Sequence, residues 1–325
     1  MTILGAGAIG CLFGALFSKI GHDVTFVTRG DHLRALRKNG LIFRGPDGVS
    51  QLEISSVADP GDIKECDLGI LVVKAKDTYE ILEKSRHLKR DGAIFLSFQN
   101  IMEKEEILAK YFGRENVVGA VTNVGASIPQ PGILKYTECD NTFLGEYPEG
   151  TSNRVKALGK EFVKAGFPIH IVENVVQVKW VKLVWIAASG GVAALTRVSS
   201  PKIFEDVNRA RLIALLLREG ADIMLANGVE PRDYPGIGFK SVLDVDLDGA
   251  EQILSERGIN MRESGVEDMK PSMLGDVLAK RRTEAEHVQG YLLRKAKEAK
   301  LAVPTIEVVY SLLRGLEEGY LHSTD

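Results

Sequence analysis

The sequence has few cysteines and no block of charge of one sign. Its 3 cysteines, Cys11, Cys66 and Cys139, are scattered over 325 residues without a C-x-x-C pair, so neither a disulfide framework nor a zinc site is indicated and no metal is expected. Lys and Arg total 41 against 44 Asp and Glu, a net charge of −3. Without a run of either sign, no nucleic-acid or anionic-membrane partner is expected.

The sequence also suggests no membrane or export segment. We expect no apolar run to reach the roughly 18 to 20 residues that span a bilayer. The N-terminus enters a glycine-rich turn where a signal peptide would need its apolar core, which favours a cytoplasmic protein. A chain of 325 residues that is 45% hydrophobic and 26% charged is ordinary for a globular protein and long enough for two domains.

The first ten residues carry the strongest motif. A short apolar run breaks into Gly5-Ala6-Gly7-Ala8-Ile9-Gly10, a G-x-G-x-x-G turn. The first glycine permits a tight turn, the second lets the backbone approach a pyrophosphate, and the third lets helix and strand pack closely. Apolar residues then recur at helical spacing from Ile9 to Ile20, and Val24 to Val27 predicts a second strand. A β-α-β unit that holds a dinucleotide at a helix N-terminus is expected.

The second strand ends in Thr28-Arg29. An NAD site of this type usually has Asp or Glu there to bond the ribose 2′-hydroxyl, whereas arginine suits a 2′-phosphate. Arg29 therefore favours NADP as the cofactor, and Asp31 keeps NAD open. The alternative is that Arg29 is a solvated surface charge.

Polar side chains follow two later strands. The apolar run Leu68 to Val73, typical of a strand covered on both faces, ends in Lys74-Ala75-Lys76, and the strand Ala93 to Phe98 ends in Gln99-Asn100. Open α/β sheets bind ligands at the carboxyl ends of their strands. Lys74 and Asn100 are therefore candidates for contacts with the nicotinamide side of the cofactor and with substrate, and Lys76 is as well explained by solvation.

The rest of the chain divides into a strand-rich and a helical part. Residues 41 to 58 resemble a hairpin-like excursion, further strands are predicted to about residue 172, and long helical segments dominate from residue 174. We predict an α/β protein with an N-terminal Rossmann-type doubly wound sheet over residues 1–172, which binds NADP. An all-α C-terminal domain is expected over residues 173–325; the family resemblance described below implies that it carries substrate-binding and catalytic residues.

The helical part opens with a segment, residues 175–188, that is apolar on nearly every side and must be buried. Lys182 lies within it. An unpaired buried ammonium is costly, so Lys182 should have a carboxylate partner or line a cleft; the alternative is that it reaches the surface along its aliphatic stem, a role that suits Lys179 better. A helix expected from Leu274 to Lys300 would turn Glu284 inward and Glu286 outward. We hypothesise that Lys182 and Glu284 pair.

These residues resemble the ketopantoate reductase (2-dehydropantoate 2-reductase) family. The resemblance covers nearly the whole chain, and its motifs are specific in combination: Gly5-Ala6-Gly7-Ala8-Ile9-Gly10, Arg29, Val72-Val73-Lys74-Ala75, Gln99-Asn100, Trp180-Val181-Lys182-Leu183, Pro271-Ser272-Met273-Leu274-Gly275-Asp276, Thr283-Glu284 and Ala302-Val303-Pro304.

The resemblance implies an NADPH-dependent reductase of a small 2-oxo acid, ketopantoate first, with its active site in a cleft between two domains. It implies Lys182 as general acid and Glu284 as the residue that orients it and binds substrate. Asn100 and Ser272 would hold polar groups of the substrate, and Lys74 would lie beside the nicotinamide. A homodimer is left open. An ammonium suits this chemistry, because hydride delivery to a ketone develops negative charge on oxygen.

Four positions depart from the family pattern. Ile186, Gly190 and Met269 stand where the family usually has asparagine, and Ile101 stands where glycine is common. Fewer polar contacts favour, as an alternative, a sibling that reduces a more apolar 2-oxo acid. Other readings are a non-catalytic NADP-binding sensor, which has no reason to keep Lys182 with Glu284, and a β-hydroxyacid dehydrogenase, which fits the late motifs less well.

Two features of residues 233–269 remain. The segment is longer than the shortest family members need, which predicts an insertion that serves as a lid or an oligomer contact. Within it, Asp244 to Gly249 begins like a calcium loop, but the twelfth position is Ser255 and not the required glutamate. An acidic loop or helix face is the better interpretation.

Overall fold

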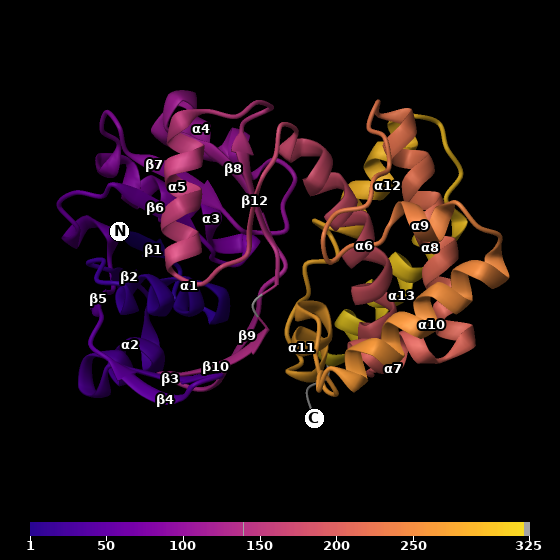
Figure 1. The fold of residues 1–325 in the computed structure, drawn as a ribbon, viewed down its shortest axis with the longest axis horizontal. Coiled ribbons are helices and arrows are strands. Elements are labelled where there is room, and N and C mark those ends of the chain that lie inside the picture. Colours follow the sequence, from indigo (N-terminus) through magenta and orange to yellow (C-terminus); the bar gives the residue numbers. More distant parts are fainter. Residues whose placement is uncertain (139, 322–325) are drawn as a thin grey trace. The chain divides into compact units, whose positions relative to one another are not determined.

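The computed structural model describes residues 1–138 and 140–321 (Figure 1). The chain divides into two compact units, one of Met1–Val176 and one that begins at Gln177. The sequence-based boundary was 172/173.

The first unit is built on a five-stranded parallel sheet of order β5-β2-β1-β6-β7. Its strands are β1 (Thr2–Leu4), β2 (Thr25–Val27), β5 (Ser55–Val57), β6 (Leu68–Leu71) and β7 (Ile94–Ser97). The helices that cover it are α1 (Ala8–Lys19), α2 (Gly30–Asn39), α3 (Thr78–Ser85), α4 (Lys104–Phe112) and α5 (Asn153–Lys164), with short 3-10 turns η1 (Pro60–Asp62), η2 (Ala75–Asp77), η3 (Arg86–Leu88) and η4 (Arg114–Asn116).

Strands β1, β2, β6 and β7 of this sheet are apolar on both faces. Ile3 and Ile70 pack into one buried cluster with aromatic residues of α1 and α5, while their neighbours Leu4 and Leu71 pack into a second cluster with residues of α3 and α4. Because side chains alternate between the faces of a strand, two separate cores require helices on both faces. The predicted doubly wound sheet is confirmed.

Two smaller sheets complete this unit. One has the order β4-β3-β10-β9, the other β12-β11-β8. Their strands are β3 (Leu41–Gly45), β4 (Gly48–Leu52), β8 (Val118–Thr122), β9 (Gly125–Gln130), β10 (Ile133–Glu138), β11 (Thr142–Glu146) and β12 (Ile169–Ile171). The predicted hairpin is confirmed for β3 and β4. The sequence-based excursion extended to residue 58, which is wrong for β5, because this edge strand pairs in parallel with β2. Three residues without an apolar run give no periodic signal.

The second unit is helical in all its described residues apart from loops and one bridge between Tyr234 and Ile237. Its helices are α6 (Val175–Thr196, which begins at the end of the first unit), α7 (Ser200–Glu205), α8 (Val207–Ala226), α9 (Lys240–Leu243), α10 (Leu247–Glu263), α11 (Ser272–Leu278), α12 (Gln289–Glu298) and α13 (Pro304–Leu321). Figure 1 shows α6 in this unit with α8, α12 and α13.

Helix α6 packs against α8 in the second unit. Gly220 of α8 lets the two helices approach, because a Cβ there would lie 2.2 Å from Val184. Contrary to our expectation about apolar runs, α6 is long and apolar enough to cross a membrane by length and composition. However, 78% of that stretch is buried inside the structure, and the prediction that this segment is buried is confirmed.

The single helix predicted from Leu274 to Lys300 is wrong. Helix α11 ends at Leu278, and α12 begins at Gln289. The break is a Schellman motif: the N–H of Lys280 bonds the Val277 carbonyl at 3.0 Å, and that of Arg281 bonds the Asp276 carbonyl at 2.8 Å. Lys280 takes the left-handed conformation (φ 51°) that glycine usually supplies at this position. The usual stop signal is therefore missing from the sequence.

Residues 233–269 form part of the helical core. Helix α10 packs on α7, so closely that a Cβ at Gly258 would lie 2.7 Å from the Pro201 carbonyl oxygen. The acidic stretch before it caps the helix, since Asp246 Oδ1 accepts a hydrogen bond from the Gly249 N–H at 2.9 Å. Among described residues, no group of three or more His, Cys, Asp or Glu side chains is arranged to hold a metal.

Candidate active site

The three glycines of the turn at the end of β1 differ in how closely other atoms surround them. A Cβ at Gly5 (φ +112°) would lie 2.8 Å from the Val73 nitrogen, and one at Gly10 would lie 2.2 Å from the Gly5 carbonyl oxygen. A Cβ at Gly7 would meet no atom of the described residues within 4 Å. Gly5 and Gly10 are therefore required by the turn and by helix packing, while Gly7 keeps the surface over the backbone open.

The N-terminus of α1 faces this open surface. Gly7 is its N-cap, no described side chain caps the helix end, and the first turn, which includes Ala8 and Ile9, contains no acidic residue. The N–H groups of a first turn lack intrahelical partners and carry the positive end of the helix dipole. This cradle fits the pyrophosphate of a dinucleotide, with Ala6 linking it to β2 through a bond to the Val27 carbonyl at 3.1 Å.

Arg29 and Asp77 face each other beside the turn. Arg29 follows β2 as the N-cap of α2, and Asp77 belongs to η2, which follows β6. Arg29 Nη2 donates to Asp77 Oδ1 at 2.9 Å, and the arginine side chain is 73% exposed. Arg29 is thus both accessible and paired. Asp31, which kept NAD open, is exposed and bonded to Arg34.

Lys74 and Asn100 lie at the same edge of the sheet, because they follow the adjacent strands β6 and β7. Lys74 is exposed, as is Lys76, and Asn100 is half-buried. Buried Gln99 ties the two strand ends together: its Nε2 donates to the Val73 carbonyl at 2.7 Å and to Thr78 Oγ1 at 2.8 Å.

Sequence reasoning missed Lys104. Its side chain is 4% exposed, and its Nζ donates to the Gln99 carbonyl at 3.2 Å and the Ala120 carbonyl at 2.7 Å. The carboxylate of Glu105, itself fully buried, lies 3.9 Å away. Lys104 therefore fixes the backbone that presents Asn100.

In the helical unit, the Glu284 carboxylate acts electrostatically on Lys182. Lys182 is partly buried on α6. Burial lowers the pKa of its ammonium from 10.5 to about 8, and the nearby Glu284 carboxylate opposes this fall. Burial dominates, so the side chain combines a positive charge with a proton that is easily lost.

Glu284 lies in the loop between α11 and α12 and is partly buried, whereas Glu286 is exposed and bonded to Arg294 and Tyr310. The loop is anchored next to Glu284: the N–H of Thr283 donates to Glu317 Oε1 at 2.8 Å, and its hydroxyl donates to the same oxygen.

Sequence reasoning also missed Glu317. It is fully buried on α13 and pairs with Arg314 at 3.0 Å. A sequence signal existed, because Glu317 continues the buried stripe of Ile306, Val309 and Leu313 at helical spacing.

The remaining predicted positions lie around α11. Ser272 is exposed at the first position of α11. A Cβ at Gly190 would meet only the Met273 Cβ, at 3.9 Å, so this position of α6 lies beside α11. Ile186 and Met269 are partly buried. The glycine turn, Arg29, Lys74 and Asn100 thus gather in the first unit, and Lys182, Glu284 and Ser272 belong to the second.

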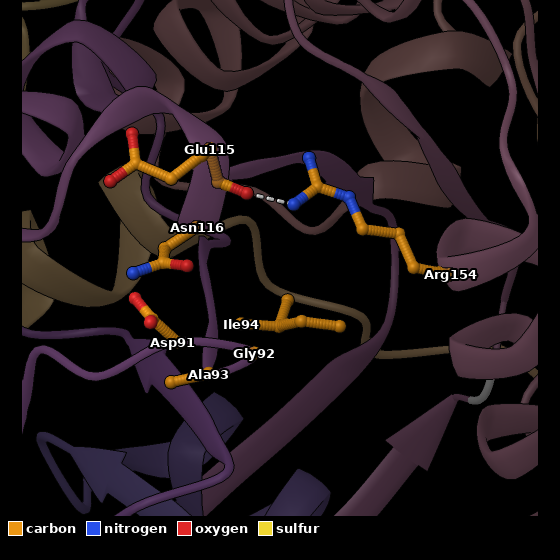
Figure 2. A pocket seen from close by; sticks show the side chains of 7 residues that line it. All are labelled: Asp91, Gly92, Ala93, Ile94, Glu115, Asn116 and Arg154. Carbon is orange, nitrogen blue, oxygen red and sulfur yellow. Dashed lines mark hydrogen bonds between the residues drawn. The ribbon is translucent and has the colours of Figure 1, made fainter.

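A hollow of about 380 Å³ lies in the first unit, and Figure 2 shows the side chains that line it. It is lined by Asp91, Gly92, Ala93, Ile94, Glu115, Asn116 and Arg154. Ile94 is the first residue of β7, so the hollow lies at the amino end of that strand, opposite the edge where such sheets bind ligands. Arg154 is occupied by bonds to the Glu115 carbonyl and to Glu146. We do not assign this hollow a function.

The two described cysteines are core residues of the first unit. The thiols of Cys11 and Cys66 are free and buried, and burial raises the pKa of both. Cys139 lies outside the described residues.

Comparisons with known proteins agree along the chain. A family model described as ketopantoate reductase PanE/ApbA matches residues 1–149, and one described as ketopantoate reductase PanE/ApbA C terminal matches residues 174–317. A 2-dehydropantoate 2-reductase of Pyrococcus horikoshii is 30% identical over 318 residues, covering 97% of this chain and 96% of that protein. The expectation that residues 233–269 are an insertion relative to the shortest family members stays a prediction.

Solved structures give the same fold. The 2-dehydropantoate 2-reductase of Geobacter metallireducens superposes with a TM-score of 0.82 at 26% identity, covering 97% of this chain and 99% of that chain. A D-mandelate dehydrogenase solved with NADH and anilino(oxo)acetate superposes with a TM-score of 0.85 at 20% identity, covering 98% and 99%. At that identity, the second likeness concerns the fold alone.

Proposed function

We propose that this chain, which belongs to the ketopantoate reductase PanE/ApbA family of pyridine-nucleotide-dependent oxidoreductases, reduces 2-dehydropantoate to pantoate with NADPH. The names of relatives that match along the whole chain support this substrate. The observation that carries the chemistry is the Lys182 ammonium beside Glu284, with a pKa that partial burial lowers to about 8.

The cofactor would be held at the carboxyl edge of the parallel sheet. The turn from Gly5 to Gly10 and the first turn of α1 would bind the pyrophosphate, Arg29 the 2′-phosphate, and Lys74 and Asn100 the nicotinamide side. The open surface over Gly7 supports this assignment. When bound, the nicotinamide supplies the hydride that the ketone carbon accepts.

Lys182 would act as the general acid. As the carbonyl carbon gains a hydride, its oxygen gains negative charge, which the Lys182 ammonium stabilises before giving up the Nζ proton. With a pKa of about 8, about nine in ten of these side chains carry the proton at pH 7. The lowered pKa makes the transfer easier than from an ordinary lysine, and the alcohol product leaves Lys182 neutral until it takes a proton from solvent.

Glu284 would keep Lys182 protonated and oriented. Its carboxylate raises the lysine pKa against the effect of burial, and the bonds between Thr283 and Glu317 fix the loop on which it stands. Ser272 and Asn100 would bind the polar groups of the substrate by hydrogen bonds.

The test is NADPH oxidation by the purified protein with ketopantoate, for the wild type and Lys182→Met. We expect the variant to lose about 10² to 10⁴-fold in kcat and to bind NADPH as tightly as the wild type. Lys202→Met, at an exposed position of α7, is the control and should retain activity. Unchanged turnover in Lys182→Met would refute the assignment of the general acid. NADPH binding without turnover of any tested substrate by the wild type would favour the non-catalytic alternative.

A second candidate is the reduction of a more apolar 2-oxo acid. Position 190 offers no side chain and meets only the Met273 Cβ within 4 Å, where the family usually places an asparagine. A panel of branched and straight-chain 2-oxo acids run beside ketopantoate decides between them, because the physiological class should have the highest kcat/KM. The same panel repeated with NADH measures the coenzyme preference.

A further inference from the structure

The ion pair between Arg29 and Asp77 spans the glycine turn. Strands β2 and β6 are the two neighbours of β1 in the sheet (Figure 1). Arg29 follows β2 and Asp77 follows β6, and their side chains meet with Nη2 and Oδ1 2.9 Å apart. The pair therefore crosses the carboxyl end of β1, where the chain enters the turn from Gly5 to Gly10.

Negative charge from the β6 side reaches Arg29 from more than one residue. Besides Asp77, Glu80 on α3 interacts with it: the pKa of Glu80 is lowered first by its hydrogen bond to Lys84 and, to a smaller extent, by Arg29. The Asp77 side chain is 28% exposed and that of Arg29 is 73% exposed. The guanidinium is thus reachable from solvent, and its charge is already partly balanced.

We propose that Asp77 sets the coenzyme preference by competing with the 2′-phosphate of NADP for Arg29. This rests on the proposed function, because it requires a dinucleotide at this edge of the sheet. A 2′-phosphate carries a charge of about −1.5 to −2 and takes arginine bidentately. It must draw Arg29 away from Asp77 and stand near that carboxylate. A 2′-hydroxyl leaves the pair intact. Asp77 therefore weakens the binding of NADPH and not that of NADH. As a result, the affinities of the protein for the two coenzymes differ less than they would without Asp77.

The experiment measures dissociation constants by titration calorimetry for the wild type and Asp77→Asn. The ligands are adenosine 2′,5′-bisphosphate and AMP, which differ by the 2′-phosphate, together with NADPH and NADH. Exposed ion pairs are weak, so we expect Asp77→Asn to tighten both 2′-phosphorylated ligands by about two- to fivefold. AMP and NADH should bind as they do to the wild type. Asp91→Asn removes the same charge at the amino end of β7 and should change none of the four.

The competition between Asp77 and the 2′-phosphate requires Arg29. Variants that lack Arg29 test this requirement. In Arg29→Met, the further change Asp77→Asn should no longer tighten NADPH. The inference is overturned if Asp77→Asn leaves NADPH binding unchanged or weakens it, if NADH tightens equally, or if the gain persists without Arg29. If the wild type binds neither dinucleotide, the proposed cofactor is wrong and the inference fails with it. Binding of both with an unchanged ratio in Asp77→Asn refutes only the role of Asp77.

Discussion

Replacing Lys182 with methionine should stabilise the protein at neutral pH while removing its activity. Burial lowers the lysine pKa from 10.5 to about 8. At 1.36 kcal/mol per pKa unit, this corresponds to about 3 kcal/mol by which the folded protein disfavours the charged lysine. Methionine keeps an unbranched stem of similar reach and has no charge to desolvate. Glu284 loses its cation, which reduces the gain, so we expect Lys182→Met to be about 1–3 kcal/mol more stable at pH 7.

The sign of the pH dependence follows from linkage. Because the folded-state pKa of about 8 lies below the unfolded value of 10.5, the unfolded chain binds more protons between these two values, and wild-type stability rises with pH in that window. The penalty is fully present below pH 8 and has gone above the unfolded pKa. The advantage of Lys182→Met should therefore shrink steadily as pH rises above 8.

Urea unfolding of the wild type and Lys182→Met at pH 7 and pH 9.5 measures this difference. Lys202→Met is the control, and a substitution at that exposed site should change the free energy of unfolding by less than about 0.5 kcal/mol at either pH. The reasoning is refuted if Lys182→Met is less stable than the wild type at pH 7, or if it is more stable by the same amount at both pH values.

Three further outcomes are expected. The kcat/KM of the wild type should fall as pH rises above about 8, because Lys182 loses its proton. Glu284→Gln should move this fall to lower pH. If Glu284→Gln leaves the pH profile unchanged, the pairing of Lys182 with Glu284 is contradicted. Gly7→Ala should leave the melting temperature unchanged and weaken NADPH binding, whereas Gly10→Ala, whose Cβ would lie 2.2 Å from the Gly5 carbonyl oxygen, should lower the melting temperature. Calorimetry and thermal unfolding of both variants check this contrast, and equal effects would show that Gly7 is a packing residue.

The parts of the structure that sequence reasoning recovered are those encoded locally. The glycine turn, the continuous apolar runs that give the parallel sheet two buried faces, and the apolar helix around Lys182 each depend on residues a few positions apart. The edge strand Ser55–Val57 was missed because three residues, one exposed and two half-buried, have no period to detect. The break before Glu284 escaped because Lys280 adopts a left-handed conformation without being glycine.

The partners of site residues could not be predicted, because they come from distant segments. Asp77 reaches Arg29 across 48 positions of sequence, and Glu317 reaches Thr283 across 34. Nothing local distinguishes Asp77 from other surface carboxylates. Glu317 is different, since a glutamate in line with a buried apolar stripe needs a partner, and that requirement can be seen before the partner is known.

The two units fix their proposed site residues by the same physical device. In each, one buried charged side chain bonds the backbone next to the functional residue: Lys104 holds the carbonyl of Gln99 beside Asn100, and Glu317 holds the N–H of Thr283 beside Glu284. Bonds to charged groups are the stronger and more directional ones, but burying a charge is expensive. An apolar residue could fill either space at lower cost and would leave the neighbouring loop free to shift.

The burial of these two charges is better explained by the positioning of the neighbouring loops than by stabilisation of the fold. This explanation predicts how neutral replacements behave. Glu317→Gln keeps an acceptor for Thr283 and loses the charge, at a cost of about 1–3 kcal/mol in unfolding free energy. If Glu317 acts through Glu284, kcat should fall and the alkaline limb of its pH profile should shift, while NADPH affinity stays as in the wild type. A loss of stability with kcat and the pH profile unchanged would make Glu317 a structural residue only. Lys104 would then be the one remaining candidate, among the described residues, for a buried charge that positions a site residue.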